Sequence, residues 1–488
     1  MLIRKFVIFF LIFSILPFWG NYHSFLVVSK TYKNPTTQKK AKRTTPKKSQ
    51  SRKKVVKSKK KKKKKIFSQR VALNVSNTIE SFEIQKGIFY KKIQFGKEPR
   101  RILVHVVEVD IDSTPYEVRI LKAKNILDGL DYLKNIYDDF QFELTRVYGG
   151  DLLAVANANF WSAFRNYPIG ILVCDGEVVS MKKYKEWSTV FFDLDNRPYI
   201  DNFQLFGEII LGDGKKIAID NVNKRSENDI SVLYNKYFGD TIPKVDFEDI
   251  EKEVQETISA LYLNLDITDS TEIEIDTNEI RKQIILSHRL ESKESTTMKL
   301  IFRYLEPSLI NRKVKVEFVG LDSGFVEIPA DGFVISLAGV DISQINLKKG
   351  EVCHLLFSTD RHSYIPFRNA VSGTPRLVRK GIAKHEAYQE GSRGYRFIAS
   401  QLPRTAVGTN MSKTKFYLFV VEVSKSNRSI GANLSQLSYI AKRIGCFDAM
   451  NLDGGGSSIM FVGGKRVGGN EESNGRRISG AIGISVRK

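Results

Sequence analysis

Charge is divided very unevenly along this chain of 488 residues. Residues 1–79 contain 22 lysines and arginines and no aspartate or glutamate, and the first acidic residue is Glu80. The rest of the chain holds the other 55 of the 77 basic residues and all 54 acidic ones, so its net charge is +1 although the whole chain carries +23. A nucleic-acid-binding fold normally carries its basic excess on the fold itself. The excess charge therefore belongs to an N-terminal arm, and we expect no specific nucleic-acid partner.

The first residues resemble an export signal. Arg4 and Lys5 precede a strongly apolar run from Phe6 to Trp19, which is typical of a signal sequence. No clean small-x-small cleavage site follows, so we favour an uncleaved membrane anchor of about 20 residues over a cleaved signal sequence. Both interpretations place the remainder of the chain outside the cytoplasm, and we assign residues 1–29 to a signal sequence or membrane anchor.

Residues 30–65 form a low-complexity segment of Lys, Thr, Ser and Pro that ends in the run Lys59–Lys65. Like charges repel one another and there is little apolar surface to bury, so this segment is expected to be extended and disordered. Two functions fit a basic stalk over 30–79. It can be a solvated spacer, or it can bind anionic envelope polymers or lipid head groups electrostatically.

Beyond the stalk the pattern is mostly that of strands. Apolar, β-branched runs predict strands at 102–109, 152–160, 169–174 and 416–423. One helix is clearly predicted, because Asn433 can cap an amphipathic segment that Gly445 ends. A stretch from about 246 to 299 is rich in Glu, Thr and Ser and is interpreted as an insertion or a small lobe.

The three cysteines each lie among apolar neighbours. We interpret Cys174, Cys353 and Cys446 as buried thiols, and one disulfide with one free thiol is the alternative. No Cys-x-x-Cys or His-Glu-x-x-His spacing predicts a zinc site.

The segment 447–458 contains the residues that point most clearly to chemistry. Three glycines, Gly454, Gly455 and Gly456, leave the turn without any Cβ atom, so its N–H groups can approach a ligand closely. Asp453 places a carboxylate at the end of the preceding strand, and Ser457 adds a hydroxyl. The alternative is a hairpin whose glycines serve geometry alone. A Walker phosphate-binding loop is excluded because neither a Gly-Lys-Ser/Thr run nor a helix follows.

Two other segments offer polar groups next to predicted strands. Arg404, before a strand of small residues, suits the bidentate binding of two phosphate oxygens, although a surface salt bridge is the plainer interpretation. The amides of Asn157 and Asn159 precede Phe160 and Trp161, a combination that suits sugar hydroxyls and a sugar face. The plainer interpretation is a strand end with a core aromatic.

In this order, the three segments resemble the motifs of the phosphodiester glycosidase family. The run from Asp453 to Ser457, after Asn-Leu, is similar to the family's most specific motif, and residues 404–408 are similar to its arginine motif. The resemblance extends from about residue 84 to 488 and includes 219–224, 232–234, the Gly-x-Pro-x-Leu segment 373–378 with Gly381, and Arg477. This chain departs from the family at Ala158 and Asn159, where the family usually has glycines. The departure bears on which substrate is bound more than on the class of reaction.

The resemblance implies an α+β fold, a mixed sheet with packed helices, in one large domain with an insertion. Residues 80–488 then form a phosphodiester glycosidase-like domain. The implied reaction is hydrolysis of a sugar-1-phosphodiester at the glycosidic C1–O bond, which releases sugar and a phosphomonoester. Phosphate is a good leaving group, so a cation that neutralises it matters more than a strong general acid. The implied partner is a sugar-phosphate or glycoconjugate substrate.

The same resemblance implies roles for individual residues. Arg404, with Arg477 as second candidate, neutralises the leaving phosphate, and Asp453 is the nucleophile, the general base, or a sugar or metal ligand. Asn157 orients the sugar or Asp453, while Thr405, Gly454, Gly455, Gly456 and Ser457 hydrogen-bond the substrate. Asp110 is the candidate for a second carboxylate. The sequence names no cofactor, and the need for a divalent cation is left open. A noncatalytic glycan-binding or exopolysaccharide-assembly protein is the alternative on the same fold.

Overall fold

The computed structural model of the protein describes residues 73–113, 115–244, 250–264, 276–341, 345–471 and 475–486. The signal sequence or anchor assigned to 1–29 and the stalk up to residue 72 lie outside the described residues. Strand β1 begins at Ser76, so the boundary that the charge pattern placed at residue 80 falls inside a strand. Within the described ranges, no helix is both long enough and apolar enough to cross a membrane.

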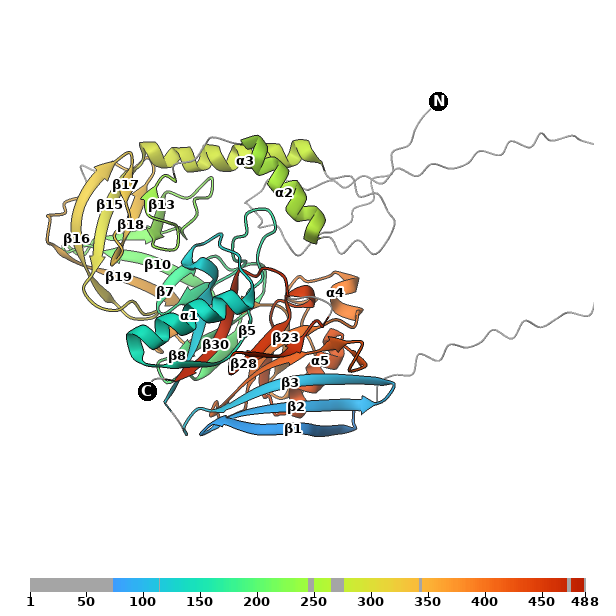
Figure 1. Cartoon of the computed structure of the whole chain (residues 1–488). Coiled ribbons are helices and arrows are strands. Elements are labelled where there is room, and N and C mark those ends of the chain that lie inside the picture. The colour runs from blue at the N-terminus through green and yellow to red at the C-terminus, as the bar shows by residue number, and fades with distance from the viewer. Residues whose placement is uncertain are drawn as a thin grey trace, which may run out of the picture.

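The lower part of the molecule in Figure 1 is built on a sheet that combines strands from residues 76–110 with strands from residues 376–451. Along its main path each strand is antiparallel to its neighbour. In spatial order these strands are β1 (Ser76–Gln85), β2 (Ile88–Lys97), β3 (Arg100–Asp110), β24 (Lys415–Val421), β23 (Arg404–Thr409), β27 (Asp448–Asn451), β21 (Arg376–Arg379) and β22 (Ile382–Ala383). Two short strands, β25 (Val423–Ser424) and β26 (Ser429–Ile430), extend it beside β3.

A second antiparallel sheet packs face to face on the first. Its order is β29 (Lys465–Gly469), β28 (Ile459–Val462), β5 (Asp151–Asn157), β30 (Gly480–Val486) and β4 (Tyr116–Lys122). Successive side chains of a strand point to opposite faces, and β5 shows the result. Its Ala154 and Ala156 pack against Val407 and Leu418 of the first sheet, whereas Val155 contributes to the core beneath α1 (Leu133–Tyr148).

Helices cover the outer faces of this sandwich. On the first sheet, Leu437 and Ile440 of α5 (Leu434–Ile444) share a core with Ala406 and Phe419. The predicted cap is confirmed, because Asn433 and Gln436 form a capping box and Gly445 follows the last turn. The short helix α4 (Tyr395–Ala399) lies beside α5, and α1 crosses β5 and β30 on the other side (Figure 1). The body therefore has four layers, helix, sheet, sheet and helix.

Two further sheets form the upper lobe and its connection to the body. The five-stranded sheet has the order β7 (Glu177–Ser180), β6 (Leu172–Cys174), β20 (Phe367–Gly373), β8 (Ser188–Asp193) and β9 (Pro198–Asp201). The eight-stranded sheet has the order β11 (Lys216–Ile219), β10 (Leu205–Ile210), β19 (Val352–Thr359), β16 (Val314–Ser323), β15 (Met298–Tyr304), β18 (Gly332–Leu337), β13 (Ser231–Asn235) and β12 (Asn221–Val222). Both contribute to one core, which contains Phe191, Phe203, Phe302 and Phe357. A two-stranded sheet pairs β14 (Thr241–Ile242) with β17 (Val326–Glu327).

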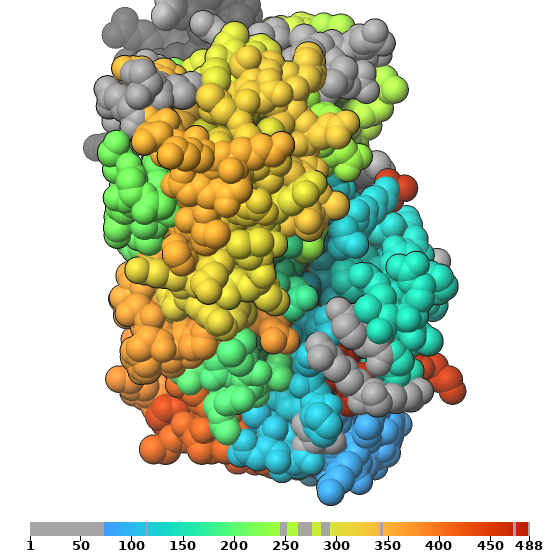
Figure 2. Space-filling model, turned by 90° about the vertical axis from the view of Figure 1, so that its left-hand side faces the viewer, coloured from blue at the N-terminus to red at the C-terminus, as the bar shows by residue number. Residues whose placement is uncertain are grey.

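The predicted insertion at about 246–299 contains α2 (Ile250–Asn264) and α3 (Thr277–Ser292), which pack on each other. It is part of a larger lobe, because the strands of the eight-stranded sheet come from residues 205–359. Figure 2 shows this lobe, in yellow and orange, above the blue edge formed by β1 and β2. The local composition marked only the helical part of the lobe.

The fold class agrees with an α+β chain, and strands predominate over helices in the described residues. The first sheet and the eight-stranded sheet are mixed, since β26 pairs with β3 and β12 with β13 in parallel, while the other pairs of described strands are antiparallel. The three cysteines are buried and free, which confirms their interpretation as thiols.

Candidate functional site

The glycine turn joins the two sheets of the sandwich at one end. It leaves β27 after Asn451, forms a short 3-10 helix over Gly455–Ser457, and enters β28 at Ile459. Gly455 has a φ of +61°, which favours glycine, and a Cβ atom placed on it would point into open space. A Cβ atom on Gly456 would come 3.7 Å from Cδ of Arg476. The turn is thus bare on one side and faces an arginine on the other.

Asp453 is fixed by three hydrogen bonds to neighbouring segments and to the turn itself. Its main-chain N–H donates to the oxygen of Ala158 over 2.9 Å, and its main-chain oxygen accepts from the side-chain amide of Asn157 over 2.7 Å. Its carboxylate Oδ1 accepts from the N–H of Gly454 over 2.9 Å. The residue is 6% exposed, so the carboxylate is held in one orientation at the edge of solvent.

Arg476 is the cation at this carboxylate, and the sequence did not single it out. Its Nη2 lies 3.4 Å from Oδ2 of Asp453, and its Nε donates to the hydroxyl of Ser457 over 2.6 Å. The guanidinium lies 5.8 Å from the centre of the Trp161 ring, and the side chain is 39% exposed. The predicted Arg477 instead lies over the ring of Tyr132, at 5.9 Å. The role expected for Arg477 stays a prediction, and Arg476 is a further candidate beside it.

Arg404 lies behind the turn and does not present its fork to a ligand. It is 1% exposed, and its Nε donates to the oxygen of Ala432 over 3.0 Å. Its Nη2 donates to the oxygens of Phe397 and Ser400 over 2.7 and 3.2 Å. Burial lowers the pKa of Arg404 to about 10. The Nε and Nη2 groups that were expected to bind two phosphate oxygens therefore donate to main-chain carbonyls instead. Arg404 positions the segment 397–404 next to the turn.

Asn157 and Thr405 are also buried supports of the turn. The Thr405 hydroxyl donates to Oδ1 of Asn157 over 2.6 Å, and the same oxygen accepts from the N–H of Ile459 over 3.2 Å. The main-chain oxygen of Thr405 accepts from Leu452 over 2.8 Å. Asn157 therefore orients Asp453, one of its two expected roles, and the hydroxyl of Thr405 is bonded to protein rather than placed for substrate.

Asp110 lies at the other end of the first sheet. In the antiparallel register Asp110 is opposite Lys415, whereas Val104 is opposite Val421, which is itself opposite Arg404. Six residues of strand separate the two positions on β3, or roughly 20 Å at the usual rise. The candidate second carboxylate is therefore corrected, because Asp110 does not belong to the site.

Glu390 is a buried carboxylate behind the turn that the sequence did not reveal. Its Oε1 accepts from the Ser188 hydroxyl and the Arg376 N–H over 2.7 and 2.8 Å, and its Oε2 accepts from the Thr374 hydroxyl over 2.7 Å. The oxygen of Thr374 then accepts from the Asn451 amide over 2.7 Å. Burial raises the pKa of Glu390. The carboxylate thus ties the Gly-x-Pro-x-Leu segment to the strand that leads into the turn.

Aromatic residues of the loop after β5 separate the turn from the upper lobe. Phe160 packs edge-on against Trp187 with ring centroids 5.1 Å apart, and Trp187 packs against Tyr184 at 4.8 Å. On the lobe side, Arg165 forms an ion pair with Glu253 of α2. Trp161 and Phe164 of the same loop are partly buried and pack against the apolar faces of α2 and α3. The insertion therefore rests on the loop whose Trp161 lies beneath Arg476.

Metal ligands do not gather within the ranges that the structure describes: no three His, Cys, Asp or Glu side chains are placed to share an ion there. Two buried polar atoms close to the turn, Nε1 of Trp161 and Oγ of Ser458, have no hydrogen-bond partner among the described residues.

The family resemblance is confirmed over the C-terminal part of the chain. Residues 327–485 match the model of the phosphodiester glycosidase family, and this range contains the glycine turn, Arg404 and Arg476. No curated protein matches the chain.

Two solved structures, from Synechocystis and Burkholderia pseudomallei, show the same fold at low identity. A protein of Synechocystis aligns with a TM-score of 0.53 at 17% identity over 82% of this chain, which spans 62% of that protein's length. A protein of Burkholderia pseudomallei K96243, described as exported, aligns with a TM-score of 0.52 at 14% identity over 84% of this chain and 96% of its own. The catalytic domain of zebrafish N-acetylglucosamine-1-phosphodiester alpha-N-acetylglucosaminidase, auto-inhibited by its pro-peptide, aligns with a TM-score of 0.37 at 12% identity over 85% and 86% of the two chains.

Proposed function

We propose, from its phosphodiester glycosidase domain, that this protein hydrolyses a sugar-1-phosphodiester at the glycosidic C1–O bond and releases sugar and a phosphomonoester. The observation that carries the proposal is the pairing of Asp453, at the bare glycine turn, with Arg476 from a later part of the matched segment, over 3.4 Å. A carboxylate and a guanidinium at one turn provide one group for the sugar carbon and one for the leaving phosphate.

Arg476 is proposed to neutralise the charge that develops on the departing phosphate. A guanidinium matches two phosphate oxygens in a planar fork, which an ammonium group does not. The bond from Nε to Ser457 fixes the plane of the group before substrate arrives, and such preorganisation is the main source of electrostatic stabilisation in enzymes. Phosphate then competes with Asp453 for the Nη2 edge, which frees the carboxylate to act on the sugar.

Asp453 is proposed to act at C1, by one of two routes. It can attack C1 directly, forming a glycosyl-enzyme that water then hydrolyses, or it can accept a proton from the attacking water. Direct attack followed by hydrolysis retains the anomeric configuration, and attack by water inverts it. Proton NMR of the first-formed sugar distinguishes these routes. The metal-ligand role of Asp453 is tested separately, by comparing turnover with and without a chelator.

The proposed location is outside the cytoplasm, in the cell envelope. It is supported by the apolar run after Arg4 and Lys5 and by the fold shared with a protein described as exported. The basic stalk is proposed to bind anionic envelope polymers or lipid head groups. A reporter fused to residues 1–80 should be active only in an assay for exported protein, and activity in the cytoplasm would contradict the location.

Turnover of a UDP-sugar and of an alkyl sugar-1-phosphate tests the reaction, with separate detection of the free sugar and of the phosphomonoester. The proposal predicts free sugar and a phosphomonoester in equal amounts. Binding of these compounds without turnover would instead support the noncatalytic glycan-binding protein.

A further inference from the structure

The guanidinium of Arg476 is held by contacts of three kinds. Its Nε donates to the hydroxyl of Ser457 over 2.6 Å, and its Nη2 lies 3.4 Å from Oδ2 of Asp453. Its central carbon lies over the ring of Trp161, 5.8 Å from the ring centre. In the proposed reaction the phosphate takes the place of Asp453 at Nη2. The bond to Ser457 and the contact with Trp161 are then the supports that stay with the cation while the phosphate leaves.

A single hydrogen bond does not fix the orientation of a planar group. The bond from Nε to Ser457 fixes one edge of the guanidinium, but the plane can still tilt about that bond. The face of an indole attracts a cation that lies within about 6 Å of its centre, so the ring of Trp161 opposes the tilt. The ring has no net charge, and unlike a carboxylate it does not compete with the phosphate for the donors of the guanidinium.

Trp161 is itself held in place by packing. Its Nε1 atom is buried and has no hydrogen-bond partner among the described residues. The side chain is partly buried against an apolar cluster that includes Val254 of α2 and Ile280 and Ile284 of α3. Both isoleucines are fully buried. The direction of the indole is therefore set by the apolar faces of the two inserted helices.

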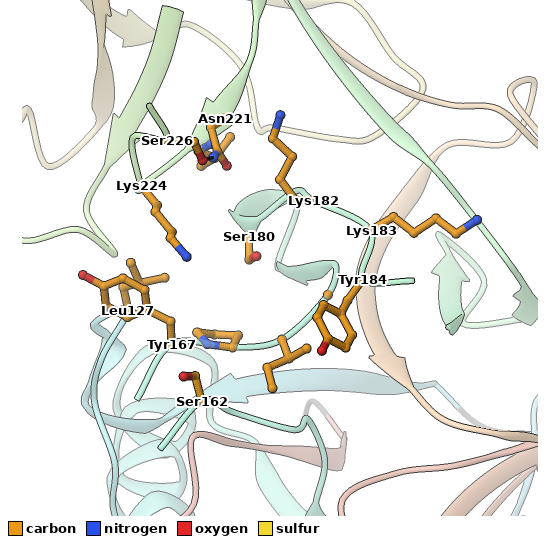
Figure 3. A pocket seen from close by; sticks show the side chains of 14 residues that line it. Leu127, Ser162, Tyr167, Ser180, Lys182, Lys183, Tyr184, Asn221, Lys224 and Ser226 are labelled. Atoms are coloured by element: carbon orange, nitrogen blue, oxygen red, sulfur yellow. Dashed lines mark hydrogen bonds between the residues drawn. The ribbon is translucent and has the colours of Figure 1, made fainter. Parts of the chain in front are cut away.

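The loop that carries Trp161 is closed on itself and tied to the insertion. The N–H of Ser162 donates to the oxygen of Tyr167 over 2.9 Å, and Arg165 forms an ion pair with Glu253 of α2. Ser162 and Tyr167 also line a cavity of about 110 Å³ (Figure 3). Because the loop borders this space, part of it is not supported by close packing, and its contacts with α2 and α3 matter the more for the position of the indole.

We propose that Trp161 is a positioning residue for Arg476, and that α2 and α3 hold it in that position. This inference rests on the proposed hydrolysis of a sugar-1-phosphodiester. The indole keeps the plane of the guanidinium directed at the leaving phosphate after Asp453 has given up its contact with Nη2. Trp161 and both helices precede residue 327, where the family match begins. The insertion thus adds a support to a cation that the matched segment supplies.

Tryptophan emission tests the contact without any need for turnover. The chain has three tryptophans, Trp19, Trp161 and Trp187, so the full-length protein with Trp19→Phe and Trp187→Phe reports on Trp161 alone. Titration with methyl phosphate should change its emission in a saturable way, because the phosphate alters the charge and position of the group over the indole. Adding Arg476→Gln should remove the response. Adding Arg146→Gln, which removes the same charge from an exposed position on α1, should preserve it. A response that survives Arg476→Gln, or no response in the parent protein, would overturn the proposal.

Kinetics on an alkyl sugar-1-phosphate separate positioning from a purely structural role. Trp161→Leu keeps an apolar side chain against the helices but removes the aromatic face, so kcat/KM should fall about fivefold, the size of a partly exposed contact between a cation and an aromatic ring. Trp161→Phe keeps a face and should stay within about twofold of the wild-type value. In Arg476→Gln protein, Trp161→Leu should cause no further loss, because there is no cation left to position. Losses that multiply in the double variant would show that Trp161 acts independently of Arg476 and would overturn the proposal.

A matched pair of core variants tests the part played by the helices. Ile284→Ala leaves a cavity in the cluster under Trp161, whereas Ile335→Ala leaves one in the core of the upper lobe. Both should unfold at lower urea concentrations. Ile284→Ala should also lower kcat/KM at least about twofold through displacement of the indole, and Ile335→Ala should leave it unchanged. Equal kcat/KM for the two variants would contradict the role of the helices. Absence of turnover by the wild type would contradict the proposed function instead, and the emission titration would still decide on Trp161.

Discussion

The side-chain amide of Asn157, at the end of β5, donates a 2.7 Å hydrogen bond to the main-chain oxygen of Asp453, just beyond the end of β27. The two strands belong to different sheets of the sandwich. The carboxylate of the site is thus positioned by the way in which the sheets pack, through a bond between residues 296 positions apart.

Asn157→Ala is expected to reduce both activity and stability. The change leaves the oxygen of Asp453, the hydroxyl of Thr405 and the N–H of Ile459 without their partner, and each buried group left so costs about 1–3 kcal/mol. A displaced carboxylate should lower kcat by roughly a hundredfold. Thr405→Val removes one donor to Asn157, so it should cost only about 1 kcal/mol. Urea denaturation and steady-state kinetics check both variants, and equal effects of the two would contradict this assignment.

Arg476 and Arg477 form a matched pair for testing the cation of the site. Arg476→Gln should lower kcat/KM by about a hundredfold, because it removes one preorganised contact to the leaving phosphate. Arg477→Gln removes the same charge one residue further on, where the side chain lies over the ring of Tyr132. Its kcat/KM should stay within about twofold of the wild-type value, which corresponds to less than about 0.5 kcal/mol. Thermal melts control for folding. If Arg477→Gln has the larger effect on kcat/KM, the assignment to Arg476 is wrong.

Arg404→Met is expected to act on stability. The substitution leaves the oxygens of Ala432, Phe397 and Ser400 without their donor, so unfolding should become easier by at least about 2 kcal/mol. Denaturation in urea measures this change. A variant that unfolds in urea like the wild type but has lost turnover would contradict this assignment. Arg404 would then be assigned to the leaving phosphate, as the sequence predicted.

Glu390 predicts a pH dependence with a definite sign. Because its pKa is raised in the folded protein, its contribution to stability is complete below the pKa of the unfolded chain and is lost as the pH rises through the folded value. The glutamine of Glu390→Gln cannot ionise, so this variant does not lose that contribution. Its free energy of unfolding, relative to that of the wild type, should therefore rise as the pH is raised from 4 to 8. Urea denaturation at both pH values measures the change. A difference that does not vary with pH would refute the prediction.

Local patterns predicted the elements that present the site. The buried strands β3 and β24, the capped helix α5 and the bare turn after β27 each follow from apolar runs, a capping residue or consecutive glycines. These features are properties of neighbouring residues, so a single sequence contains enough information to locate them.

Long-range features were predicted less well, for physical reasons. Arg476 and Arg477 are alike in sequence, and only the packing of Trp161 and Tyr132 separates their directions. Asp110 follows a strand as Asp453 does, but the antiparallel register places the two at opposite ends of the sheet. Arg404 has the residue type that suits phosphate, yet the carbonyls that surround it come from segments brought there by folding.

Hydrolysis of an alkyl sugar-1-phosphate by wild type, Asp453→Asn and Asp110→Asn tests whether Asp453 is the catalytic carboxylate. Asparagine keeps the shape of aspartate and the bond from Gly454, so Asp453→Asn should melt normally and lose at least about a hundredfold in kcat/KM, or nearly 3 kcal/mol of transition-state stabilisation. Asp110→Asn, the same change at the other end of the sheet, should retain wild-type activity. If Asp453→Asn melts normally and keeps more than about a third of wild-type kcat/KM, well under 1 kcal/mol, Asp453 is not the catalytic carboxylate and the glycan-binding function should replace the enzymatic one.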